Sequence, residues 1–176
     1  MRTYLMLFGN LTALQAQAQF AGANNNNLFD TWASYLGALG LPNYTTDFPR
    51  GTRTNALMMA TFERLGIALC DKAVEKELKA AAPPPIAQRN IFTFDIPKDG
   101  KLDLAQFTLR FDAMHQTFLS YPVDQAPTDR VNRFYKLYND TLALQPTDKG
   151  LKFTPAEAAW AAMCYGLIRH PEFHLY

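Results

Sequence analysis

The segment "TPAEAAWAAMCYGLI", residues 154–168, is the part of the sequence that most constrains the fold. Thr154 and Glu157 form a capping box, and Pro155 occupies the first helical position, where its missing N–H is not needed. One face of the helix then carries the apolar residues Trp160, Met163, Cys164, Leu167 and Ile168. Pro171 ends the pattern. Such a stripe must be buried against other elements, and the sequence offers helices for that purpose.

Helical periodicity recurs along most of the chain. It predicts helices over 1–21, 28–40, 53–80 and 103–119, and one that begins near Asp129. The asparagine run at 24–27 and the proline-containing stretch 41–51 are predicted loops. We therefore expect an all-α fold: an irregular bundle of about five to six helices with long connecting loops. The 176 residues fit one domain, and a subdivision would fall at the proline-rich connection 81–90.

Two segments depart from simple amphipathic patterning. "NIFTFDI", residues 90–96, alternates like a strand but has no partner strand, so a lone extended segment is expected. "DKAVEKELK", residues 71–79, is predicted to be a solvated helix face supported by i,i+4 pairs.

The N-terminal stretch 1–21 imitates a secretory signal, with one arginine, a short apolar run and small residues near "AQAQFA". Because Gly9 and Asn10 interrupt the apolar run, we favour a first helix of the mature fold, and an origin as a signal peptide stays open. The sequence contains no run of roughly 18 apolar residues, so no membrane span is predicted. A net charge of +1 gives no broad field for nucleic acid or anionic lipid.

The loop "DIPKDGKLDLAQF", residues 95–107, has nearly the spacing of a calcium-binding EF-hand. Its weak candidate ligands are Asp95, Asp99 and Asp103. Proline replaces the ligand at loop position 3, and glutamine replaces the bidentate glutamate at position 12. The simpler interpretation is a turn at Asp99-Gly100, followed by a helix that Asp103 caps and Gln106 reaches back to close.

Histidines supply two further weak candidates. Met114 and His115 are residue types that ligate haem, but no Cys-x-x-Cys-His is present and a methionine among phenylalanines usually packs. In an extended tail, His170, Glu172 and His174 would share one face and could bind zinc. We instead expect Phe173, Leu175 and Tyr176 to pack while the polar side chains point outward. No metal or other cofactor is predicted.

Cys70 and Cys164 each lie in or beside an apolar stripe. A bridge needs both cysteines at the same level along two packed helices, a condition that most pairs fail. Free cysteine is also among the most buried residue types. The prediction is two buried, unbridged thiols, with a disulfide as the alternative in an oxidising compartment.

The last 50 or so residues carry an arginine-started aromatic helix, a variable loop, "AWAAMC", an aliphatic pair and a "PEF" ending with a tyrosine. This pattern resembles the C-terminal helical segments of large secreted proteins of planctomycetes and myxobacteria, some of them associated with cytochrome-type domains. The resemblance implies a periplasmic or extracellular setting and an association with redox proteins. It implies no catalytic residues.

Two classes of function follow. The first is a non-catalytic helical subunit or protein-binding module of a larger, envelope-associated assembly, with protein partners still to be identified and a cytoplasmic location as the alternative. The second is a metal- or haem-binding protein or enzyme that uses His115, or His170 with Glu172 and His174. No nucleophile-elbow serine or glycine-rich phosphate loop occurs, so we favour the first class and no enzymatic activity.

Overall fold

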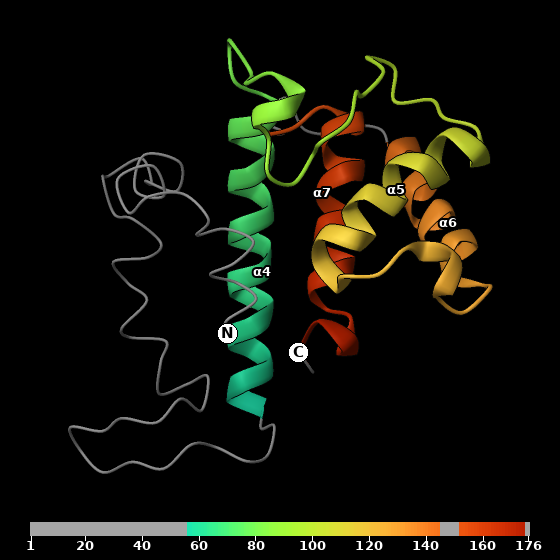
Figure 1. Cartoon of the computed structure of the whole chain (residues 1–176). Helices are drawn as coiled ribbons and strands as arrows, with labels where there is room; N and C mark the ends of the chain where they lie inside the picture. The colour runs from blue at the N-terminus through green and yellow to red at the C-terminus, as the bar shows by residue number, and fades with distance from the viewer. Residues whose placement is uncertain (1–55, 145–151, 175–176) are drawn as a thin grey trace. The chain divides into compact units, whose positions relative to one another are not determined.

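The computed structural model describes residues 56–144 and 152–174, and the chain divides into two units, 1–72 and 73–176 (Figure 1). The described residues form the α-helices α4 (Ala56–Glu77), α5 (Leu104–Leu119), α6 (Arg130–Ala143) and α7 (Pro155–Ile168). Short 3-10 helices follow three of them: η1 (Ile86–Gln88), η2 (Val123–Gln125) and η3 (Pro171–His174). These ranges contain no strand, which confirms the all-α prediction. The helices predicted over 1–21 and 28–40 lie outside the described residues.

The helix starts are built as the sequence predicts. Asp103 accepts a hydrogen bond from the Gln106 backbone N–H, and the Gln106 side chain accepts from the Asp103 N–H, which together form a capping box for α5. Thr154 and Glu157 form the same arrangement at α7. None of the helices in residues 56–144 and 152–174 is both long and apolar enough to cross a membrane.

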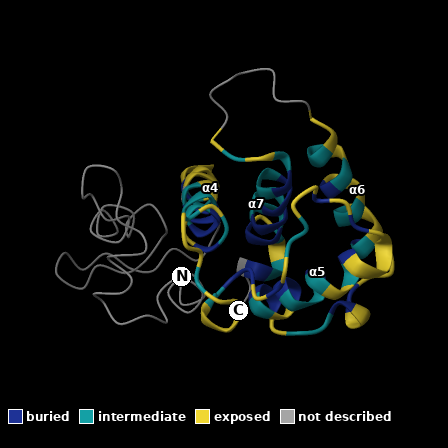
Figure 2. Cartoon of the chain, turned by 90° about the horizontal axis from the view of Figure 1, so that it is seen from above, coloured by how far each residue is buried: buried dark blue, intermediate teal, exposed yellow. Residues whose placement is uncertain are grey.

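An aromatic core holds the second unit together. α7 packs mainly against α6 and also against α5. Every residue of α7 is buried or intermediate, whereas α5 and α6 carry exposed residues as well (Figure 2). The rings of Phe107, Tyr138 and Trp160 lie within 5.2–6.0 Å of one another, centroid to centroid. The ring of Phe94, in the segment that was predicted to be extended, packs against Trp160 with the centroids 4.5 Å apart and the ring planes tilted by 50°. The segment 90–96 is therefore stabilised by ring packing and needs no partner strand.

Gly100 is a point of close approach between the loop before α5 and the two last helices. Its φ of 67° lies in the left-handed region, and a Cβ there would come within 2.7 Å of the Leu142 Cδ1. Its carbonyl accepts a hydrogen bond from the buried Tyr138 hydroxyl at 2.6 Å. Burial raises the pKa of Tyr138 to about 12. The predicted turn at Asp99-Gly100 is thus also a packing contact.

The predicted solvated face 71–79 is wrong at Glu77. This carboxylate is buried and accepts hydrogen bonds from three successive backbone N–H groups: those of Asn90 at 2.9 Å, Ile91 at 3.1 Å and Phe92 at 2.9 Å. Three converging donors compensate the desolvation of a charge that helical periodicity would place in water. These hydrogen bonds join the end of α4 to residues 90–92.

The cysteine prediction is right about burial and wrong about bonding. Cys70 and Cys164 are both buried, but both are disulfide-bonded and neither is a free thiol. Helical spacing says which face each cysteine occupies. It does not say whether two thiols come within bonding distance of each other.

Helical spacing in the sequence predicts that one stripe of α5 packs into the core, and Leu104, the first member of that stripe, departs from the prediction. The other members, Phe107, Phe111, Met114 and Phe118, are buried, whereas Leu104 is 44% exposed. Leu109, on the same helix, is 74% exposed. These two leucines form an apolar surface that periodicity did not predict.

Candidate functional site

The acidic side chains of Asp99 and Asp103, in the loop before α5, accept hydrogen bonds from nearby backbone N–H groups. The Asp99 carboxylate accepts from the Lys101 N–H at 3.2 Å, and the Asp103 carboxylate accepts from the Gln106 N–H at 2.7 Å. Asp95 contributes its backbone carbonyl, which accepts from the Arg110 side chain at 2.7 Å. The cap interpretation is therefore confirmed. Within the described ranges, no group of three or more His, Cys, Asp or Glu residues is placed to hold a metal ion.

The second candidate region is a set of four polar side chains, His115, Tyr121, Arg130 and Glu172, here called the polar cluster. The Arg130 guanidinium lies at its centre and is almost fully buried. It donates to Glu172 Oε1 at 2.8 Å, to the Tyr121 hydroxyl at 2.5 Å and to His115 Nε2 at 2.9 Å. The Tyr121 hydroxyl donates to Glu172 Oε2. The cluster thus connects α5, α6 and η3 through one cation.

These contacts fix the protonation state of His115. Arginine can only donate, so Nε2 must accept, and Nδ1–H then donates to the Tyr121 carbonyl at 2.8 Å. Burial lowers the pKa of His115, and the neighbouring Arg130 charge adds to that effect. The neutral imidazole has both nitrogens engaged, which leaves none to coordinate a metal or haem in this arrangement.

Glu172 is held in its charged form, whereas His115 is held neutral. The hydrogen bond from Arg130, followed by that from Tyr121, lowers the pKa of this carboxyl to about 2. The expectation that Glu172 points outward is wrong, because its carboxylate is bound by both groups. The zinc alternative required an extended tail, but Pro171–His174 is a 3-10 helix, so alternate residues do not share a face.

His170 and Phe173, two other residues of the tail, both have contacts within the protein. His170 Nδ1 accepts from the Glu172 N–H at 3.3 Å, and burial lowers the pKa of His170. Phe173 is buried and packs on Phe118, as predicted, with ring centroids 5.9 Å apart. The positions of Leu175, Tyr176 and the His174 side chain lie outside what the structure describes.

Sequence reasoning missed Tyr121 and Arg130. Tyr121 lies in the connection after α5, and Arg130 is the first residue of α6, where a basic residue is ordinarily solvated. Within the cluster, each polar side-chain atom discussed above has a partner in the cluster or in the backbone. A set of mutually satisfied groups of this kind positions helices and offers no free nucleophile or base.

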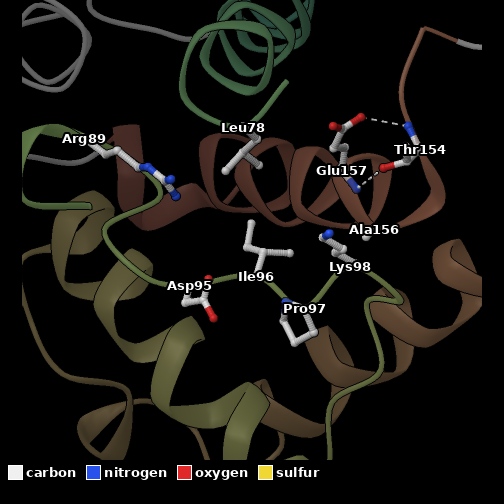
Figure 3. Close-up of a pocket in the computed structure, with 9 residues that line it drawn as sticks. All are labelled: Leu78, Arg89, Asp95, Ile96, Pro97, Lys98, Thr154, Ala156 and Glu157. Atoms are coloured by element: carbon white, nitrogen blue, oxygen red, sulfur yellow. Dashed lines mark hydrogen bonds between the residues drawn. The ribbon is translucent and has the colours of Figure 1, made fainter. Parts of the chain in front are cut away.

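A cavity of about 370 Å3 lies between the segment 95–98 and the start of α7 (Figure 3). Its charged lining residues are Arg89, Asp95, Lys98 and Glu157, two of each sign. Arg89 donates to the carbonyls of Pro84 and Phe94, and Glu157 belongs to the capping box drawn in Figure 3. The balance of charge gives the cavity no preference for an anion or a cation.

An apolar groove of about 730 Å3 runs between α5 and η2, here called the α5–η2 groove. Its lining residues are Leu104, Ala105, Thr108, Leu109, Asp112, Pro122, Val123 and Asp124. Asp112 Oδ1 accepts from the Val123 N–H at 2.6 Å, a bond that holds η2 against α5 and fixes the shape of the groove. The exposed Leu104 and Leu109 lie along it.

Comparison of the chain with protein-family models, with curated proteins and with solved structures gave no match. Function is therefore inferred from the geometry of the molecule. Among the regions described above, the α5–η2 groove combines exposed apolar side chains with a fixed concave shape, and it is the candidate functional site.

Proposed function

We propose that this protein is a non-catalytic helical subunit or protein-binding module of a larger, envelope-associated assembly, and that it binds its partner through the α5–η2 groove. The observation that carries the proposal is the exposure of Leu104 and Leu109 along an apolar groove. An apolar concave surface rimmed by polar residues is typical of interaction sites.

Burial of the two leucines supplies the driving force. Covering a leucine side chain fully is worth about 1.5–3 kcal/mol, and Leu109 is 74% exposed before any partner binds. The Asp112–Val123 hydrogen bond fixes the groove in advance, so little ordering is needed on the side of this protein. Burial of the two leucines on a preformed surface therefore contributes favourably to the affinity for a partner.

The contacts within the polar cluster support a structural role for its histidine and glutamate, which would otherwise be candidates for catalysis or metal binding. His115 and Glu172, both candidates for metal or catalytic roles, are bound to Arg130. An imidazole that accepts from arginine is a poor general base, because the bound cation disfavours its protonation. This favours the binding module over the alternative of a metal- or haem-binding enzyme.

The disulfide-bonded state of Cys70 and Cys164 supports an oxidising compartment for this protein. Disulfides persist in oxidising environments and are rare in the cytosol. A periplasmic or extracellular location, in line with the resemblance of the C-terminal segment, therefore forms part of the proposal.

The test compares proteins that co-purify with the tagged chain from its native cell. The wild type, Leu109→Glu and Leu137→Glu would be compared by quantitative mass spectrometry. Leu137 is a matched control, an exposed leucine on α6 outside the groove. We expect one or more proteins to be depleted at least about tenfold with Leu109→Glu and retained with Leu137→Glu, since a charge in a desolvated contact is strongly unfavourable. Identical recovery with both variants would contradict the proposal.

A further inference from the structure

The lining of the α5–η2 groove carries two acidic residues and no basic one. From this we infer that its occupant is a segment of another protein that combines apolar anchors with a lysine or arginine, whose charge is placed against Asp112 and Asp124. This inference rests on the proposed function and deepens it by naming the chemistry of the partner.

Both carboxylate oxygens of Asp112 accept hydrogen bonds from within the protein. Its Oδ1 accepts from the Val123 N–H at 2.6 Å and its Oδ2 accepts from the Gln116 side-chain amide at 2.7 Å. Both donors are neutral, so they orient the carboxylate without cancelling its charge. Asp112 therefore presents a fixed negative charge at the groove.

Asp124 is an exposed residue in the first turn of η2, and it lines the same groove. Two carboxylates at one groove create a local negative potential, and the groove lining itself offers nothing to offset it. A partner with a cation is steered toward such a surface, whereas an acidic partner is repelled.

An apolar segment that covers Leu104 and Leu109 removes water from the neighbouring carboxylates. The donors on Asp112 are neutral, so covering Asp112 and Asp124 without a countercharge is costly, and a purely apolar or acidic occupant would lose much of what the leucines contribute. A lysine or arginine beside the apolar anchors removes that cost, and arginine can do so with two parallel hydrogen bonds.

The groove also limits the size of the contact. Leu104 and Asp112 are eight positions apart on α5, which is about 12 Å along the helix axis at 1.5 Å per residue. That length accommodates a short segment with about two apolar side chains and the adjacent basic residue. The occupant is thus a linear motif or one exposed turn of a folded partner.

The test is selection of a phage-displayed library of random 16-residue peptides on the full chain, followed by measurement of individual peptides by fluorescence anisotropy. Expected winners contain two apolar residues and at least one lysine or arginine. They should bind Leu109→Glu at least about tenfold more weakly than wild type. Asp124→Lys should weaken them about fivefold or more, whereas Asp140→Lys, an exposed acid on α6 outside the groove, should change little.

The outcomes separate the inference from the proposed function. Peptides that depend on Leu109 but are not enriched in basic residues, or that bind Asp124→Lys as well as wild type, would overturn the charge inference and leave the binding groove standing. Failure to select any peptide that depends on Leu109 would overturn both. Concentration-dependent dimers in sedimentation, abolished by Leu109→Glu, would replace the basic partner with a second copy of this chain.

Discussion

Replacement of Glu172 by glutamine tests the physical role of the polar cluster. Glutamine keeps the shape of the carboxyl and removes the charge that Arg130 binds at 2.8 Å. Lowering the pKa of this carboxyl from 4.5 to about 2 on folding corresponds to about 3 kcal/mol of stability at pH 7. Because the side chain of Glu172 is 30% exposed, solvent screening makes that figure an upper value, and we expect Glu172→Gln to cost about 2–3 kcal/mol.

The sign of the pH dependence follows from the lowered pKa. The contribution of Glu172 is complete above pH 4.5 and is lost as the pH falls toward 2, because the unfolded chain takes up the proton first. The difference in unfolding free energy between wild type and variant should therefore fall to about half by pH 3.

Denaturant unfolding at pH 7, 5 and 3 measures that difference directly. Contributions from other titrating groups cancel between wild type and variant, which leaves the term due to Glu172. Asp124→Asn, a change at an exposed acid, serves as the control and should stay within about 0.5 kcal/mol of wild type. A cost of Glu172→Gln that is the same at pH 7 and pH 3 would refute the reasoning.

Three further predictions concern His115, the disulfide-bonded cysteines and two residues with positive φ. Because burial lowers the pKa of His115, the stability of wild type should decrease as the pH falls below about 6.5, and His115→Gln should flatten that decrease in melting curves, with a residual slope from His170. Alkylation of the denatured, non-reduced chain should label no cysteine, against two after reduction, and Cys→Ala at both positions should cost about 2–4 kcal/mol; two labels without reduction would show free thiols. Ser120→Gly should stabilise the protein by about 0.5–1 kcal/mol, because Ser120 ends α5 with a φ of 66°. Gly100→Ala should destabilise it by more than about 1 kcal/mol, through backbone strain and contact with Leu142. In chemical denaturation, a less stable Ser120→Gly variant or a more stable Gly100→Ala variant would contradict the respective prediction.

Local signals in the sequence predicted the helices well because their causes are local. The capping boxes at Asp103 and Thr154 depend on residues three positions apart, and the stripes on α5 and α7 depend on 3.6-residue periodicity. The segment 90–96 was predicted to be a lone extended stretch; it forms no strand, and the chain bends at Asn90, Ile91 and Phe94. For the caps and the stripes, the deciding residues lie within a single helix.

The polar contacts could not be predicted because their causes are distant in sequence. Arg130 and Glu172 are separated by 42 residues, and only the packing of α5, α6 and η3 brings them together. Glu77 was assigned to solvent because its three donors belong to a segment 13–15 residues away. The α5–η2 groove depends on where the chain turns after α5, and no residue pattern in the sequence indicated it.

Site-specific photocrosslinking in the native cell tests the central claim most directly. A benzophenone amino acid at position 109 would place the reactive group in the α5–η2 groove, and the same amino acid at position 137 would place it on α6. We expect a discrete crosslinked product with another protein from position 109, none from position 137, and loss of that product when Leu104→Glu is added. No product at 109, or equal products from both positions, would contradict the proposed binding groove.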